Sequence, residues 1–72
     1  MKNSIKENSK FRLGDEIYNP LTDEYFMIVS YYYMENYNEV MVFVESSNKN
    51  LEEKVVSYRL SHLIRLGYYI IS

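Results

Sequence analysis

The chain has 72 residues, no cysteine, one histidine and a formal net charge of -2 at pH 7. A chain this short forms one domain, because a second hydrophobic core would need a chain closer to the usual ~100 to 150 residues per unit. With His62 as the sole histidine, the sequence excludes a disulfide framework and a Cys/His zinc site. No apolar run approaches the ~20 residues of a membrane span, so we expect a cytoplasmic protein without signal peptide, membrane anchor or cofactor.

The tyrosine content favours strands and interfaces. Nine tyrosines contribute to an aromatic content of 17%, and tyrosine suits both sheets and half-exposed contact surfaces.

The charged residues are divided into blocks along the chain. Residues 1–12 carry four bases and one acid, residues 13–53 carry nine acids and one base, and residues 54–72 carry three bases and no acid. Such blocks bias the choice of partner through the surface potential.

The chain begins with a polar stretch. Residues 1–10 have few apolar side chains and no clear period, which predicts a flexible tail before a domain at residues 11–72. Within that domain, residues 14–18 predict a short strand that stops at Pro20, because proline cannot donate to a ladder.

Residues 25–34 are the longest strand candidate. Strict alternation places Tyr25, Met27, Val29, Tyr31 and Tyr33 on one face and Phe26, Ile28, Ser30, Tyr32 and Met34 on the other. Both faces are apolar, so we expect one of them to meet another molecule. The sequence therefore predicts a homodimer through this strand or through an exposed edge.

The remaining elements follow from turn and period signals. Residues 35–38 predict a turn, residues 39–45 a returning strand, and residues 54–60 a third long strand. Residues 60–65 then predict one helical turn capped by Ser61 and ended by Gly67, before a short last strand at residues 68–71. The predicted core is Ile17, Phe26, Ile28, Val40, Val42, Val44, Val56, Leu60, Leu63, Ile64 and Ile70.

This order of elements resembles the small SH3-like β-barrels, which include KOW and Tudor modules. Residues 14–18 (Gly-Asp-Glu-Ile-Tyr) match the opening strand, and residues 57–66 match the closing strand and turn. The resemblance implies a mainly β, five-stranded barrel with one helical turn before the last strand. The composition, rich in Asn, Lys, Ile and Tyr, also resembles small host-takeover proteins of phages that infect low-GC Gram-positive bacteria, among which are inhibitors of the replication sliding clamp.

Catalysis has little support in the residue pattern. A nucleophile and base pair would need His62 with an adjacent serine, Ser61, whose side chain diverges from it. The neighbouring acids at 15–16, 23–24 and 52–53 point apart in strands and loops, and a spaced cation-binding loop is missing. The two glycines are too far apart for a phosphate cradle. We therefore expect a protein that is not an enzyme.

The acids and tyrosines predict a protein-binding surface instead. Spaced acids can engage a basic surface built for DNA, as a mimic of DNA, and tyrosines supply the anchors that often dominate interface energy. The same acids can equally keep the domain soluble and protect sheet edges. The predicted partner-binding residues are Asp23, Glu24, Tyr31, Tyr33, Glu35, Tyr37, Glu39 and Glu45. Their expected partner is a host protein with a basic DNA-binding surface, for example the sliding clamp.

Two further readings stay open. Asn19, Thr22, Tyr25 and Phe26 have the spacing of a clamp-binding peptide, although Asn replaces Gln and Thr replaces an apolar residue. The alternative function is a nucleic-acid-binding module that uses the basic tail with Lys54, Arg59 and Arg65. The acidic charge of residues 13–53 makes direct nucleic-acid binding the weaker of the two functions.

Overall fold

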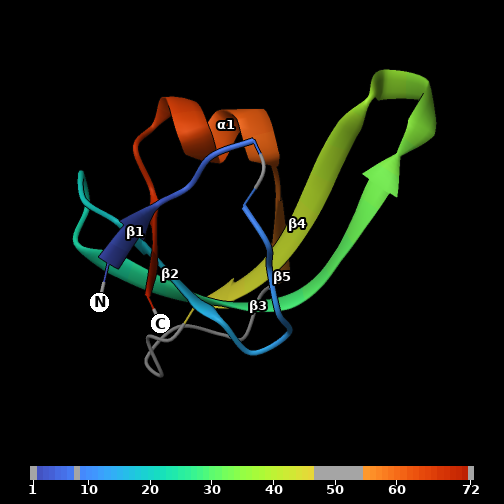
Figure 1. Cartoon of the computed structure of the whole chain (residues 1–72). Coiled ribbons are helices and arrows are strands. Elements are labelled where there is room, and N and C mark those ends of the chain that lie inside the picture. The colour runs from blue at the N-terminus through green and yellow to red at the C-terminus, as the bar shows by residue number, and fades with distance from the viewer. Residues whose placement is uncertain (1, 8, 47–54, 72) are drawn as a thin grey trace.

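The computed structural model of the protein describes residues 2–7, 9–46 and 55–71. These residues form one antiparallel sheet of six strands in the order β1-β6-β2-β3-β4-β5. A short helix lies on the concave side of the curved sheet (Figure 1). The elements are β1 (Lys2–Ser4), β2 (Glu16–Asn19), β3 (Glu24–Met34), the 3-10 helix η1 (Glu35–Tyr37), β4 (Glu39–Ser46), β5 (Val55–Arg59), α1 (Leu60–Arg65) and β6 (Tyr69–Ile71).

The mainly β fold and the order of its elements agree with the prediction. The structure has six strands where five were expected, and its sheet is open, with β1 and β5 as the two edges. The helical turn at residues 60–65 lies between the last two strands, as predicted. From β2 onward the element order thus matches the expectation, whereas a closed barrel of five strands does not describe this sheet.

The additional strand, β1, lies in the stretch that we expected to be a polar tail. Ser4 pairs with Tyr69, and the Ile5 N–H donates to the Tyr68 carbonyl at 3.2 Å. Ile5 is only 4% exposed and belongs to the core. Three polar residues show no apolar alternation that would predict a strand. Backbone hydrogen bonds to β6 and the buried side chain of Ile5 hold this strand in place.

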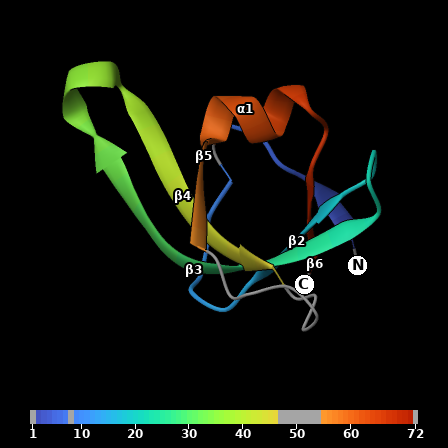
Figure 2. The same ribbon diagram turned by 180° about the vertical axis from the view of Figure 1, so that it is seen from behind.

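The core lies between the concave face of the sheet and α1 (Figures 1 and 2). It consists of Ile5, Phe11, Ile17, Phe26, Ile28, Val42, Val44, Leu60, Leu63, Tyr68 and Ile70. Of the predicted core residues, Val40 and Ile64 are only partly buried, and the prediction for Val56 is wrong because it is 41% exposed on an edge strand. Tyr68 takes an unpredicted core position, where its hydroxyl accepts a hydrogen bond from Asn19 Nδ2 at 3.0 Å.

A register irregularity in β3 changes the faces that strict alternation predicted. Ile28 pairs with Val44 but Ser30 pairs with Phe43, so Val29 is an extra residue in the ladder. Because a bulge reverses the alternation, Tyr31 lies on the same face as Ile28 rather than opposite to it. The prediction that Tyr31 and Tyr33 share a face with Tyr25 is therefore wrong.

β3 and β4 continue past the other strands as a two-stranded ribbon that ends in η1 (Figures 1 and 2). We call residues 30–43 the hairpin arm. On the β3 side, pairing with β2 stops at Met27, and on the β4 side, pairing with β5 begins at Met41. The end of the arm is therefore only two strands wide.

Candidate functional site

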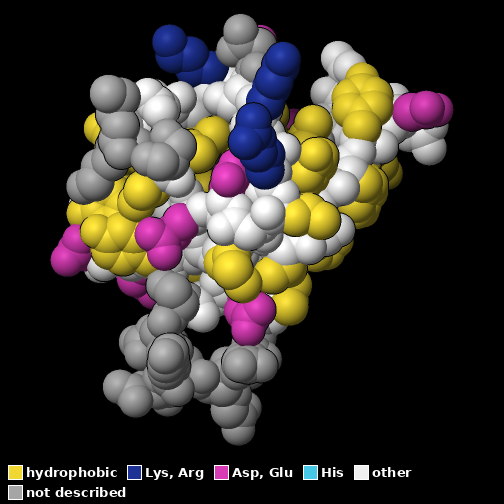
Figure 3. All heavy atoms as spheres, turned by 60° about the horizontal axis from the view of Figure 1, so that its bottom comes forward, with side chains coloured by type: hydrophobic (Ala, Val, Ile, Leu, Met, Phe, Trp, Pro, Cys, Tyr) yellow, Lys and Arg dark blue, Asp and Glu magenta, His cyan; other side chains and the backbone are white. Residues whose placement is uncertain are grey.

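The hairpin arm carries four exposed tyrosines. Tyr31, Tyr32 and Tyr33 are 44%, 48% and 54% exposed, and Tyr37 in η1 is 69% exposed. Hydrophobic side chains follow the arm over much of the face seen in Figure 3. Exposed aromatic side chains in one continuous region mark interaction sites more often than scattered single ones do. The arm is therefore the principal candidate surface.

The two faces of the arm present different tyrosines. Tyr32 lies on the convex side, where its ring stacks on Phe43 at a centroid distance of 5.7 Å. Tyr31 lies on the concave side, with its ring centroid 6.2 Å from that of Phe11. The Tyr33 hydroxyl donates to Asn38 Oδ1 across the turn. These contacts limit ring motion, so less side-chain entropy would be lost when a partner binds.

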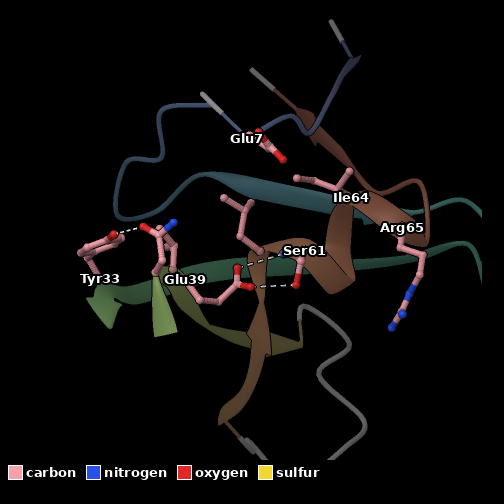
Figure 4. Close-up of a pocket in the computed structure, with 9 residues that line it drawn as sticks. Glu7, Tyr33, Glu39, Ser61, Ile64 and Arg65 are labelled. Carbon is pink, nitrogen blue, oxygen red and sulfur yellow. Dashed lines mark hydrogen bonds between the residues drawn. The ribbon is translucent and has the colours of Figure 1, made fainter. Parts of the chain in front are cut away.

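A groove separates the concave face of the arm from α1, with a volume of about 450 Å³. Figure 4 shows Tyr33 and Glu39 on its strand side, Ser61 and Ile64 on its helix side, and Arg65 directed away from it. A second hollow adjoins this groove, because both share Glu7, Val40 and Leu60, and it extends to Phe11 and Tyr31. The groove therefore has an apolar floor beside polar groups.

Glu39 has a structural role in this groove. Its Oε1 accepts the Ser61 N–H at 3.2 Å, and its Oε2 accepts the Ser61 hydroxyl at 2.9 Å. Arg59, at the N-cap position of α1, makes no capping hydrogen bond with its side chain. The expected cap by Ser61 is therefore replaced by a carboxylate from β4, which satisfies an orphan N–H of the helix.

The other predicted acids lie far apart. Glu35 is exposed at the end of the arm, whereas Asp23 and Glu24 lie at the opposite end of β3. Eleven residues of strand lie between these ends, a path of about 30 Å along the chain at roughly 3.3 Å per residue. Glu45 lies between them, paired with Met27. The structure thus brings Tyr31, Tyr33, Glu35, Tyr37 and Glu39 to the arm and leaves Asp23, Glu24 and Glu45 away from it.

Asp23 also has a partner within the fold. The Tyr18 hydroxyl donates to Asp23 Oδ1 at 2.7 Å, and this hydrogen bond is the main reason why the pKa of Tyr18 is raised. Tyr18 lies between Tyr25 and Tyr69, with ring centroids 4.8 and 6.5 Å away. The sequence analysis did not single out this second aromatic cluster, although alternation within β2 places Tyr18 opposite to buried Ile17.

Residues 19–26, which have the spacing of a clamp-binding peptide, do not form an exposed peptide. Asn19 and Phe26 are each only 8% exposed, and Phe26 belongs to the core. The Asn19 side chain accepts the Leu21 N–H at 3.0 Å and donates to Tyr68. The interpretation of this stretch as core strand therefore fits the structure better than a clamp-binding peptide does.

His62 and Ser61 do not form a nucleophile and base pair. The ring of His62 stacks on Tyr58 at 5.7 Å, and its Nδ1 lies 3.3 Å from Arg65 Nη2, whereas the Ser61 hydroxyl is directed to Glu39. Within residues 2–7, 9–46 and 55–71, no three His, Cys, Asp or Glu side chains come together as a potential metal site. Lys54, which the nucleic-acid alternative needs, lies outside the described residues.

No protein-family profile, curated protein or solved structure matches this chain. In the part of the chain that the structure describes, no helix is long and apolar enough to span a membrane.

Proposed function

We propose that this protein is a non-enzymatic binding domain that contacts a partner protein through the hairpin arm. The observation that supports this most strongly is the exposure of Tyr31, Tyr32, Tyr33 and Tyr37 on a ribbon that extends beyond the body of the domain. Tyrosine is among the residues that most often dominate binding energy, because it buries a large area at low entropic cost. Contacts with Phe11, Phe43 and Asn38 hold the rings of Tyr31, Tyr32 and Tyr33 in place before the partner arrives.

The charge of the arm favours a protein partner over nucleic acid. Residues 30–46 contain the acids Glu35, Glu39 and Glu45 and neither lysine nor arginine. Binding to a phosphate backbone depends on neutralisation by such bases. Lys10 and Arg65 are the bases that line the two hollows beside the arm. Arg65 is directed away from the groove (Figure 4), and Lys10 lines the hollow beside Tyr31, so the acids of the arm suit a neutral or basic protein surface.

The narrower form of this proposal is a phage factor that inhibits a host DNA-handling protein, for example the sliding clamp, and that shares the SH3-like plan. The succession from β2 to β5, followed by α1 and β6, supports the SH3-like part of that proposal. The dispersed acids alter the proposed mechanism. Contact with a basic DNA-binding surface would depend on the arm tyrosines and Glu35, since Glu39 and Asp23 already have partners in the fold.

The test is capture from a nuclease-treated lysate of a low-GC Gram-positive bacterium, followed by titration of the purified captured protein or of purified sliding clamp. The double variant Tyr37→Ser/Glu35→Lys changes the end of the arm. Leu21→Ser is the matched control, because Leu21 is 73% exposed at the opposite end of β3. We expect the wild type and the control to bind one protein equally, and the arm variant to bind it at least about tenfold more weakly.

Two outcomes would overturn the proposal. Equal binding by the arm variant and the wild type would move the contact elsewhere on the domain. Recovery of nucleic acid alone, with an affinity that falls steeply as salt is added, would favour the nucleic-acid-binding alternative.

A further inference from the structure

The edge of β3 in the arm is open beyond Ile28. Gly14 N–H donates to the Ile28 carbonyl, and Ile28 N–H donates to the Asp15 carbonyl, both at 2.8 Å. After Ile28, residues 30–34 pair with β4 on one side, and no strand of the described residues pairs with them on the other. Natural edge strands are usually protected by lysine, proline, an inward charge, a bulge or a covering element. The bulge at Val29 lies at the start of this edge, and residues 30–34 (Ser-Tyr-Tyr-Tyr-Met) themselves have no lysine, proline or charge.

We propose that two copies of this protein pair through this edge, with β3 of one copy antiparallel to β3 of the other and with Tyr32 at the two-fold axis. The proposal concerns self-association and does not depend on the identity of the partner protein. It specifies where the homodimer expected from the sequence would form. An antiparallel pair of identical strands is isologous, so each contact occurs twice.

The length of the open edge supports a second copy as the occupant. In this register Tyr31 lies opposite Tyr33 of the second copy, and Ser30 lies opposite Met34. The five paired residues end just before Ile28, where the Gly14 and Asp15 backbone already occupies the edge. The open segment is therefore centred on Tyr32, as a two-fold pairing requires. Aromatic residues directly opposite each other stabilise antiparallel pairs.

Charge also favours pairing between copies. Like charges placed opposite each other would oppose a symmetric pair, and residues 28–34 contain no charged side chain. Each arm is two strands wide at its end, and such a ribbon is only marginally stable by itself. Pairing two arms would produce a continuous four-stranded segment, and it would leave Tyr32 and Phe43 of both copies on its convex face. The additional backbone hydrogen bonds would stabilise the association of the two arms.

The first test exploits the self-pairing of Tyr32. Sedimentation of the full chain from micromolar to millimolar concentration should show a monomer and dimer in equilibrium. Tyr32→Lys and Tyr32→Glu should each weaken the dimer at least about tenfold, because each puts two like charges at the axis. An equimolar mixture of the two variants should restore a dimer, since lysine then faces glutamate. Met27→Lys is the matched control, on the same strand and face but between Glu16 and Glu45.

A second test reports the register directly. The chain has no cysteine, and residues facing each other across an antiparallel pair have the Cα separation that a disulfide needs. Tyr32→Cys should therefore give a disulfide-linked dimer under mild oxidation, and Met27→Cys should remain monomeric. A wild-type chain that stays monomeric at millimolar concentration would overturn the proposal. So would a mixture of the lysine and glutamate variants that fails to associate, whatever the arm variants do to partner binding.

Discussion

The carboxylate of Glu39 caps helix α1 by accepting both the backbone N–H and the hydroxyl of Ser61, at 3.2 and 2.9 Å. The contact joins the first residue of β4, near the end of the hairpin arm, to α1, although 22 positions separate the two residues in the chain. The direction in which the arm leaves the body is therefore coupled to the position of α1. A side chain that the sequence analysis assigned to partner binding holds the domain together.

Replacing Glu39 should destabilise the fold. Glu39→Ala should lower the free energy of unfolding by about 1 kcal/mol, as for loss of other N-terminal helix caps. Glu39→Gln should lose less, because the amide oxygen still accepts one hydrogen bond. Urea unfolding followed by circular dichroism measures both values. Glu35→Ala, at the exposed end of the arm, is the control, and an equal loss in both alanine variants would contradict the capping role.

Asn19 should be more sensitive to substitution than an exposed asparagine. It is 8% exposed, and its side chain connects the Leu21 N–H with the Tyr68 hydroxyl. Asn19→Ala removes both hydrogen bonds within a buried site, so we expect a loss of about 2 kcal/mol in the free energy of unfolding. Asn36→Ala, in exposed η1, should change stability by less than about 0.5 kcal/mol. Denaturant unfolding of the two variants would show no difference if the Asn19 contacts were dispensable.

Gly67 ends α1 in the left-handed conformation, with φ at 76°. Its N–H donates to the Ile64 carbonyl at 3.1 Å, and the Tyr68 N–H donates to the Leu63 carbonyl at 3.0 Å, which is a Schellman motif. A Cβ at this position would meet no atom within 4 Å. Gly67→Ala should therefore lower the melting temperature through backbone strain alone, at a cost of about 1 to 2 kcal/mol.

The matching control for that variant is Gly67→Asn, because asparagine tolerates the left-handed region better than alanine does. Its melting temperature should fall between those of the wild type and Gly67→Ala. Equal melting temperatures for the alanine and asparagine variants would mean that backbone conformation does not set the cost.

Stability should fall in alkaline solution through Tyr68. Burial raises the pKa of its hydroxyl above the ordinary value of 10.0. The folded state therefore binds the Tyr68 proton more tightly than the unfolded state does. The resulting stability is fully present below pH 10 and is lost as the pH rises through the higher pKa of the folded state. Denaturant midpoints measured from pH 8 to pH 11 should show this loss.

Tyr68→Phe isolates this contribution, because the variant lacks the titrating hydroxyl. It should be less stable than the wild type at pH 8, where Asn19 Nδ2 loses its acceptor, by about 1 to 3 kcal/mol. Above pH 10 its stability should decline less steeply. Parallel pH profiles for the two proteins would assign the alkaline loss to other groups.

Local sequence patterns predicted the order of the elements from β2 to β6 and most of the core. Alternation located β4 and the first half of β3, and the change of period followed by Gly67 located α1, because these signals depend on residues close together in the chain. Tyr31 and Tyr33 were also predicted to bind a partner; Tyr33 lines the groove beside the arm and Tyr31 the adjoining hollow, and partner binding stays a prediction.

Contacts between side chains that are distant in the chain depend on the tertiary structure. The bulge at Val29 exchanged the faces of the arm tyrosines, and it follows from pairing with β4 and from the backbone of Gly14 and Asp15, which are distant in the chain. Glu39 became a helix cap for the same reason, since its partner Ser61 comes from another element. The register of pairing and contacts between distant elements are set by packing, which no local pattern of residues encodes.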